Sequence, residues 1–306
     1  MKELRLAMKV MVVVVTYNFE PWMERCLGSL RRSEHPADVV VVDNNSSDRT
    51  VELLRANYPE VELLTNKCNL GFGRANNQGF SLALARGYDA VFLLNQDAWI
   101  EPATIGTLCR LSEEHPEYGI LSPLHLTGTG NRLDHGFAVY THLPEDALPC
   151  AVDEDDRLRR ADFINAAFWF LPRHTLQVAG GFSPLFYHYG EDKDYANRMR
   201  YHGLLVGFSP LVRGWHDRER RQPSRKSAFR SERVYLLSEY ANPCYSLPRA
   251  FAFGVLAGAK KALLALLRLR LRDALAYVGI VFRLLWATAS VVRLRKLVRA
   301  RGPHFI

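Results

Sequence analysis

One apolar run, VMVVVV at residues 10–15, decides the fold class, and it leads directly into Thr16-Tyr17-Asn18. A continuous β-branched run is typical of a strand that is covered on both faces, as strands in parallel sheets are. The run is short and lacks a cleavage site of small residues. We therefore expect a first, buried strand here and no signal peptide.

Strand-like and helix-like patterns alternate after this run. Further strands are expected at residues 39–42, 61–64 and 91–94. Helices are expected between them, at residues 22–30, 47–56 and 75–85, and again after Glu101. This alternation predicts an α/β fold with a parallel sheet and crossover helices, in which ligands collect at the carboxyl ends of the strands.

The composition is that of a globular protein, but the charge is unevenly distributed. The chain has 306 residues, 48% of them apolar and 24% charged, and a net charge of +8. Twelve Lys and Arg residues and one acid, Asp273, lie between Arg249 and Arg301, which gives this segment +11 and leaves −3 for the rest. A basic segment of this kind can bind nucleic acid, anionic lipid or an acidic partner.

The five cysteines, at positions 26, 68, 109, 150 and 244, are scattered and form no CxxC motif. This usage is typical of free thiols in a reducing compartment. We therefore expect a cytoplasmic protein.

The basic segment is rich in Ala, Leu and Val. Its longest charge-free stretch, residues 250–259, is shorter than the roughly 18–20 residues that cross a bilayer. Residues 274–292 are apolar or small except for Arg283, so a span there remains an alternative, at a cost of roughly 2.5–3.5 kcal/mol for the arginine. We expect helices that lie on the anionic inner face of the cell membrane, and the other alternative is helices that pack on the body of the protein.

Four polar loops follow the four expected strands. They lie at residues 16–18, 43–48, 69–79 and 95–97. Turns favour Asn, Asp and Gly in any case, but four such loops at one sheet edge indicate a binding site. Asp97, at the end of a strand, can hold Mg²⁺ or Mn²⁺ while diphosphate oxygens complete the shell.

A second acidic cluster, Glu191-Asp192-Lys193-Asp194, leads into an expected helix. Acids at this position stabilise the helix dipole, and one of them can also serve as a general base. The sequence alone does not distinguish helix stabilisation from a role as a general base.

Two common nucleotide-binding classes do not fit. Gly71-Phe72-Gly73 begins a pattern like a dinucleotide fingerprint, but Asn76 stands where the third glycine belongs. The sequence contains no GxxxxGK[ST] motif, which excludes the P-loop enzymes.

Five motifs occur in one order, at residues 12–18, 41–48, 69–77, 94–98 and 190–192. Together they resemble glycosyltransferase family 2, inverting enzymes of the GT-A fold, and especially its bacterial rhamnosyltransferase-like branch. The resemblance covers about residues 8–240. It implies a Rossmann-like, mostly parallel sheet flanked by helices in a catalytic domain at residues 1–245. The basic amphipathic helical segment, which the charge and composition predict, then occupies residues 246–306.

The resemblance also implies a donor site in the four loops. Its residues would be Thr16, Tyr17, Asn18, Asp43, Asn45, Asn69, Gly71, Gly73, Arg74, Asn77, Asn95 and Gln96. Asp43 would hydrogen-bond the pyrimidine ring, and the loop at residues 69–77 would close over the nucleotide-sugar. Glycines suit that loop because they let the backbone approach a diphosphate closely.

Asn95-Gln96-Asp97 stands where the family has its DxD motif, with Asn95 in place of the first acid. The resemblance therefore implies Asp97 as the ligand of Mn²⁺ or Mg²⁺. His216 matches a histidine that completes the metal site in several members of the family.

Asp192 matches the family's catalytic base, and Glu191 is its usual acidic neighbour. Residues 163–168 resemble the acceptor-side segment, with Asn165 conforming to the pattern and Ala166 replacing a glycine.

These implications predict an inverting, metal-dependent transfer of a sugar from a nucleotide-diphosphate donor to a hydroxyl of a glycan in cell-surface polysaccharide synthesis, with a lipid-linked glycan as the expected acceptor. The donor suggested by the branch is dTDP-rhamnose, with UDP-linked galactose, galactofuranose or N-acetylglucosamine as alternatives. We expect a peripheral membrane protein and no nucleic-acid partner. A nucleotidyltransferase would need a basic, Gly-rich loop after the first strand, which residues 16–20 are not, and a non-catalytic nucleotide-sugar-binding or scaffold protein of a glycan assembly complex is the other alternative.

Overall fold

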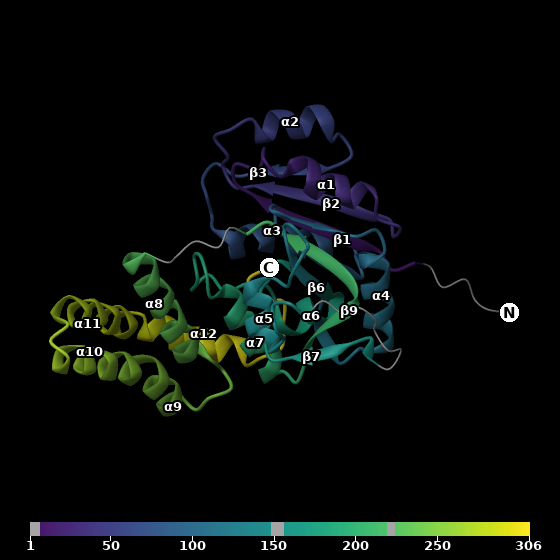
Figure 1. The fold of residues 1–306 in the computed structure, drawn as a ribbon. Coiled ribbons are helices and arrows are strands. Elements are labelled where there is room, and N and C mark those ends of the chain that lie inside the picture. Colours follow the sequence, from purple (N-terminus) through teal and green to yellow (C-terminus); the bar gives the residue numbers. More distant parts are fainter. Residues whose placement is uncertain (1–6, 148–155, 219–223) are drawn as a thin grey trace.

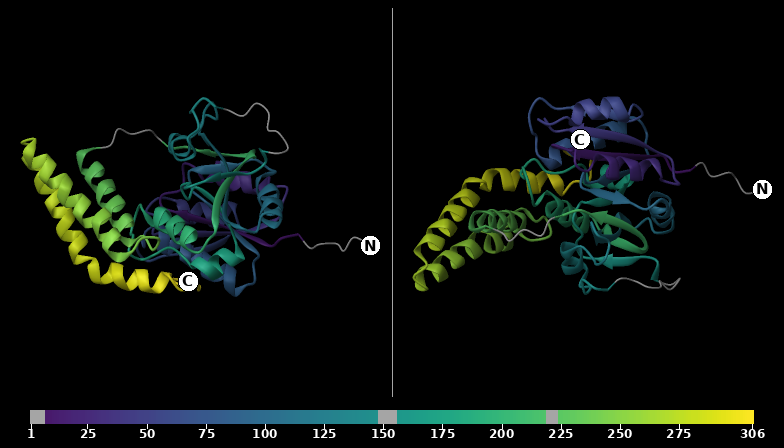
Figure 2. Two further views of the ribbon diagram at one scale, coloured as in Figure 1. Left: turned by 90° about the horizontal axis from the view of Figure 1, so that it is seen from below. Right: turned by 45° about the horizontal axis from the view of Figure 1, so that its top comes forward.

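The computed structural model describes residues 7–147, 156–218 and 224–306 (Figure 1). Its centre is a nine-stranded sheet with helices packed on both faces, and a group of C-terminal helices extends away from the sheet (Figure 2). The predicted α/β class is confirmed. Cys26, Cys68, Cys109 and Cys244 are free thiols, as expected, and Cys150 lies outside the described residues.

The four strands predicted from the first hundred residues form the parallel half of the sheet. They lie in the order β3 (Glu62–Thr65), β2 (Ala37–Asp43), β1 (Val10–Thr16) and β4 (Ala90–Leu94). The crossover helices are α1 (Met23–Arg31), α2 (Thr50–Asn57) and α3 (Phe72–Ala85). In the register, Thr16 lies opposite Asp43 and Asp43 opposite Thr65, so these strands end at one edge.

Two helix starts differ from the prediction. Helix α3 begins at Phe72 rather than Ala75, because Gly71, at φ +82°, turns the chain directly into the helix. Helix α2 begins at Thr50, where the Asp48 carboxylate accepts hydrogen bonds from the Thr50 amide (3.1 Å) and hydroxyl (2.6 Å).

Beyond β4 the sheet becomes mixed. The order continues through β8 (Phe168–Pro172), β6 (Tyr118–Thr127), β9 (Leu205–His216) and β5 (Ala98–Ile100), and β7 (Arg159–Ala161) pairs with β9. Helices α4 (Thr104–Glu114), α5 (His135–Thr141), α6 (Arg173–Ala179) and α7 (Glu191–Tyr201) connect and cover these strands. Four of the eight strand pairings are antiparallel. The pairing of β6 with β9 is parallel, so the second half of the sheet is mixed, whereas β3, β2, β1 and β4 are parallel throughout.

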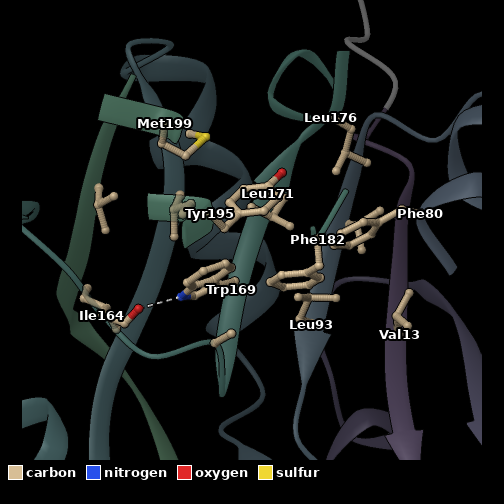
Figure 3. Packing of buried hydrophobic residues seen from close by; sticks show 14 of the residues in the cluster. Val13, Phe80, Leu93, Ile164, Trp169, Leu171, Leu176, Phe182, Tyr195 and Met199 are labelled. Atoms are coloured by element: carbon tan, nitrogen blue, oxygen red, sulfur yellow. Dashed lines mark hydrogen bonds between the residues drawn. The ribbon is translucent and has the colours of Figure 1, made fainter. Parts of the chain in front are cut away.

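An aromatic cluster joins the two halves of the sheet on one face (Figure 3). The Phe182 ring stacks on Phe80 of α3 at 5.6 Å and on Trp169 of β8 at 5.9 Å. The Trp169 indole donates to the Ile164 carbonyl (3.1 Å). Tyr195 of α7 packs against the rings of Trp169 and Phe182. This packing fixes α3 and α7 relative to the sheet.

The expected C-terminal helices are present, and they pack on one further helix. They are α9 (Leu247–Phe251), η2 (Ala252–Leu256), α10 (Ala257–Leu267), α11 (Leu271–Trp286) and α12 (Thr288–Val298). Leu236 and Tyr240 of α8 (Arg225–Ala241) share a hydrophobic cluster with residues of η2, α11 and α12. The domain boundary at 245/246 stays a prediction.

The chain returns to the sheet domain after α12. The Gly181 amide donates to the His304 carbonyl (2.7 Å), and the Gly302 amide donates to the Val178 carbonyl (3.1 Å). The C-terminal helices are therefore attached to the sheet domain at both of their ends.

Among the described residues, one helix, Leu247–Leu267, is long and apolar enough to cross a membrane. A bent pair of helices would be a second candidate if the two helices together formed one span. The pair is α11 with α12, which meet at a bend of 54°. The alternative span expected at residues 274–292 is thus broken at Ala287. The helix at Leu247–Leu267 was not expected as a span, because its lysines and arginine interrupt the charge-free stretch.

Candidate active site

The end of β2 holds Asp43 in a fixed orientation. Its side chain is 2% exposed, and its carboxylate accepts from the Ser46 amide (3.1 Å), the Ser46 hydroxyl and the Thr16 hydroxyl (3.4 Å). An Asp followed three residues later by Ser is a local pattern that folds into such a turn. The predicted donor residues Thr16 and Asp43 are thus brought together.

The neighbouring loop is held by two predicted donor residues. The Gln96 amide accepts from the Tyr17 amide (2.7 Å) and donates to the Tyr17 carbonyl (3.1 Å). The Asn18 side chain accepts from the Ser47 amide (2.9 Å). Gln96 and Asn18 therefore position the exposed Tyr17 ring. Asn45 is also exposed, at φ +70°.

The loop at residues 69–77 packs against the segment at residues 182–187. Gly71 could not be replaced without a clash, because a Cβ there would lie 2.2 Å from the Tyr187 carbonyl oxygen. The Asn69 side chain accepts from the Gly71 amide (2.9 Å), and the Asn69 carbonyl accepts from the Tyr187 hydroxyl (3.1 Å). These contacts fix the loop that was predicted to close over the donor.

The same segment uses two further predicted donor residues. The Asn77 amide accepts from the Phe182 amide (2.7 Å) and donates to the Phe182 carbonyl (2.9 Å). A Cβ on Gly73 would lie 2.8 Å from the Phe182 Cβ. Both residues therefore have packing roles in this structure. Arg74 remains exposed and lines, with Asn77, Phe305 and Ile306, a cavity of about 680 Å³ beside α3.

Asp97 and His216, the predicted metal ligands, are brought together. Asp97 follows β4 and His216 ends β9, and the Asp97 carboxylate oxygen lies 3.3 Å from His216 Nε2. The Asp217 amide also donates to the Asp97 carbonyl (2.8 Å), which joins the two segments. Asn95 precedes them, and its amide donates to the Ala167 carbonyl (3.0 Å).

The pair fits a divalent cation. Two ligands at right angles, each about 2.1 Å from an ion, lie about 3.0 Å apart, close to the spacing observed. One carboxylate and one imidazole are a donor set that suits Mn²⁺. No group of three or more His, Cys, Asp or Glu side chains that could hold a metal occurs in the described part of the chain, so oxygens from diphosphate or water would have to complete the shell.

The structure adds one acid that sequence reasoning missed. Asp134 Oδ2 lies 3.8 Å from Nδ1 of His216, on the side of the ring away from Asp97. Asp134 caps helix α5, because its Oδ1 accepts from the Phe137 amide (3.0 Å). An Asp before a short apolar segment is a recognisable helix cap, but nothing in that pattern points to His216.

The three acids at the start of α7 have different environments. Asp194 forms a buried ion pair with Arg198 (2.9 Å). Glu191 is 6% exposed, its Oε2 has no hydrogen-bond partner, and burial together with the charge of Asp192 raises its pKa to about 8. Asp192 accepts from the Lys193 amide (2.7 Å), and burial raises its pKa as well. Asp194 is thereby assigned a structural role, which leaves Asp192 and Glu191 as candidates for the chemistry.

The acceptor-side segment lies next to these acids. Lys193 sits over the Phe163 ring at 5.0 Å, and Phe163 contacts Tyr140 of α5 at 4.7 Å. Burial, and then the charge of Asp192, raises the pKa of Tyr140. Asn165 is buried with its Oδ1 unpartnered, whereas Ala166 packs in the hydrophobic core. Sequence reasoning missed Tyr140.

Comparison with known proteins identifies the class. Residues 11–145 match glycosyl transferase family 2. The domain that contains the four polar loops is therefore a family 2 glycosyltransferase domain, and the chain is a glycosyltransferase. This confirms the resemblance and favours the enzyme over a non-catalytic scaffold.

The chain is similar to particular members as well. It is 27% identical over 230 residues to N-acetylglucosaminyl-diphospho-decaprenol L-rhamnosyltransferase of Mycobacterium tuberculosis, which covers 67% of this chain and 75% of that protein. Its fold resembles GalNAc-T7, solved with UDP, GalNAc and Mn²⁺ (TM-score 0.59, 16% identity, 76% of this chain and 48% of that one). It also resembles S. aureus TarS 1-349 in complex with UDP (TM-score 0.56, 15% identity, 95% and 90%). At these identities the two structures support the GT-A-like fold alone.

Proposed function

We propose that the chain is an inverting glycosyltransferase that transfers rhamnose from a dTDP-linked donor to a hydroxyl of a lipid-linked glycan in cell-surface polysaccharide synthesis. The observation that carries this proposal is the 3.3 Å approach of Asp97 to His216 at the sheet edge where Asp43 also lies. The name of the mycobacterial relative supports both rhamnose and a lipid-linked acceptor. The UDP-bound neighbours make a UDP-sugar the alternative donor.

Asp43 would bind the pyrimidine ring of the donor, because its carboxylate is fixed by Ser46 and Thr16 at the end of β2. Tyr17, which Gln96 holds in place, is exposed beside it and would line the nucleotide pocket. Asp97 and His216 would hold Mn²⁺ or Mg²⁺, which would neutralise the charge that develops on the leaving diphosphate.

Asp192 would act as the base. It accepts the proton of the acceptor hydroxyl while that oxygen bonds to the anomeric carbon and the bond from that carbon to the diphosphate breaks on the opposite face. With its pKa raised to about 8, Glu191 is mainly protonated at pH 7. Because Glu191 is then neutral, it places no second negative charge beside the Asp192 carboxylate.

The test is a transfer assay with the purified full chain. Mn²⁺ is supplied with dTDP-rhamnose or with UDP-galactose, UDP-galactofuranose or UDP-N-acetylglucosamine, and the acceptor is a polyprenyl-diphosphate-linked N-acetylglucosamine. Release of dTDP together with a glycolipid heavier by one rhamnose supports the proposal. Release of UDP with a different added sugar overturns the donor, and no transfer with any donor overturns the acceptor class.

The C-terminal helices would associate peripherally with the inner face of the cell membrane. Large apolar side chains are exposed on α10, α11 and the turn between them, among them Leu269 at 85% and Trp286 at 91%. Arg268, Arg270 and Arg272 flank that turn. Exposed apolar side chains bordered by arginines are typical of a surface that enters the interface of an anionic bilayer.

Liposome co-sedimentation tests this association. Binding to phosphatidylglycerol vesicles at low salt should fall as ionic strength rises, and Trp286→Ser should weaken it. Leu211→Ser, at an exposed apolar position on β9, is the matched control and should change nothing. Binding that salt does not reduce would indicate insertion of a span such as Leu247–Leu267 instead.

A further inference from the structure

The His216 ring lies between two carboxylates. On one side Nε2 faces Asp97 at 3.3 Å, and on the other Nδ1 faces Asp134 at 3.8 Å. The His216 side chain is 3% exposed, and within the described residues Nδ1 has no hydrogen-bond partner. A buried ring nitrogen in this position requires an explanation, because buried polar atoms are nearly always paired.

The two carboxylates favour different tautomers of the ring. A neutral imidazole carries its proton on one nitrogen and offers a lone pair on the other. With the proton on Nε2, His216 donates to Asp97 and neither group is free for a cation. With the proton on Nδ1, the lone pair of Nε2 lies beside Asp97, and the N–H needs an acceptor on its far side.

Asp134 is held where such an acceptor is needed. Its backbone amide donates to the His125 carbonyl (2.9 Å), which ties it to β6, and its Oδ1 caps α5. Oδ2 is then left to face His216. The nearby His125 ring stacks on Phe137 (4.5 Å) and contacts Phe168 edge-on (4.6 Å). Burial lowers the pKa of His125 well below its usual value, so that ring brings no positive charge to the pair.

We propose that Asp134 is a positioning residue that accepts the Nδ1 proton of His216 and thereby presents Nε2, together with Asp97, to a divalent cation. This inference rests on the metal site of the proposed function. Carboxylates that hold the second nitrogen of a metal-binding histidine typically affect metal affinity 10–100-fold. Closing the present distance to a hydrogen bond requires a shift of about 1 Å, within the reach of a side-chain rotation.

The test compares substitutions that separate capping from positioning. Asp134→Ser keeps a helix cap but is too short to reach His216, whereas Asp134→Asn keeps both a cap and an oxygen. Asp162→Ser, at a side chain that is 81% exposed, is the matched control. Mn²⁺ binding is followed by the electron paramagnetic resonance signal of the free ion, with dTDP and with UDP. The ring tautomer is followed by ¹⁵N NMR, with His216→Asn identifying the signal.

Asp134→Ser should weaken Mn²⁺ binding by about 10–100-fold and shift His216 toward the Nε2–H tautomer. Asp134→Asn should lie between it and the unchanged protein, and all variants should unfold at nearly the same temperature. If Asp134→Ser leaves the tautomer and the Mn²⁺ affinity unchanged while the unchanged protein binds Mn²⁺, the inference is overturned and the metal site stands. If the tautomer shifts but the unchanged protein binds no Mn²⁺ with either nucleotide, the proposed metal site fails, and with it the presentation of Nε2 to a cation.

Discussion

Two regions at the same sheet edge are built differently. One is the set of four polar loops at residues 16–18, 43–48, 69–79 and 95–97, and the other is the acid–imidazole side, which contains Glu191, Asp192 and His216. In the loops, Asp43, Asn69, Asn77 and Gln96 each make two or more hydrogen bonds within the protein. Across the edge, several buried polar atoms have no hydrogen-bond partner. Of the six such atoms in the described residues, four belong to His125, Asn165, Glu191 and His216. The comparison indicates that the loops are already formed in the free protein, whereas the acid–imidazole side has bonds left for ligands and reacting groups.

The largest expected effect is on the chemistry alone. Asp192→Asn should lower kcat by about 10²- to 10⁴-fold, because a positioned general base contributes about that much, while the unfolding temperature stays close to that of the unchanged protein. Steady-state transfer assays with circular dichroism melting measure both. Near-normal turnover of this variant would refute Asp192 as the base.

The next effect separates Asp192 from its neighbour. Asp194→Asn should destabilise the fold by about 3–5 kcal/mol, because it leaves Arg198 buried without its ion-pair partner. Urea unfolding measures the loss. A variant that is as stable as the unchanged protein but inactive would reverse the roles assigned to the two acids.

The third prediction concerns the pH dependence of folding stability that Glu191 causes. Because burial raises its pKa to about 8, the fold favours the protonated form, so the stability that Glu191 contributes is complete below about pH 4.5 and is lost as pH rises toward 8. Glu191→Gln should remove this dependence, which amounts to at most about 1.4 kcal/mol for each pH unit in that window. Urea unfolding of both proteins from pH 5 to 8 provides the measurement, and parallel curves would contradict the assigned pKa.

The smallest effect tests the loops. Gly71→Ala should cost about 1–3 kcal/mol of stability, because alanine is strained at φ +82° and its Cβ would meet the Tyr187 carbonyl. It should also raise the KM for the donor more than it lowers kcat. Gly87→Ala, at φ +73° with open space around it, controls for the backbone strain. Equal losses in both variants would show that the contact with Tyr187 is unimportant.

Sequence reasoning reached as far as local patterns extend. Strands β1 to β4 were predictable because each contains an apolar run that a polar loop follows. The antiparallel strands were not, because the pairing of β8 with β4 joins segments about 80 residues apart and leaves no mark in the spacing.

The same limit applies to the site. Asp97 stood out at the end of a strand, while Asp192 and His216 were assigned through the family resemblance. Sequence could not show that the Asn77 amide is used by Phe182, 105 residues away, or that a helix cap at Asp134 faces His216. Such roles arise from tertiary packing.

The most direct test of the central claim is the unfolding temperature with nucleotide-sugars, measured with Mn²⁺ and again with EDTA. We expect a rise with one donor in the presence of Mn²⁺, since a ligand at 100 times its Kd adds about 2.7 kcal/mol. The rise should disappear in EDTA and in Asp97→Asn. Two results would contradict a metal-dependent donor site at Asp97 and His216. One is that no donor raises the unfolding temperature, and the other is that the rise is equally large in EDTA and in Asp97→Asn.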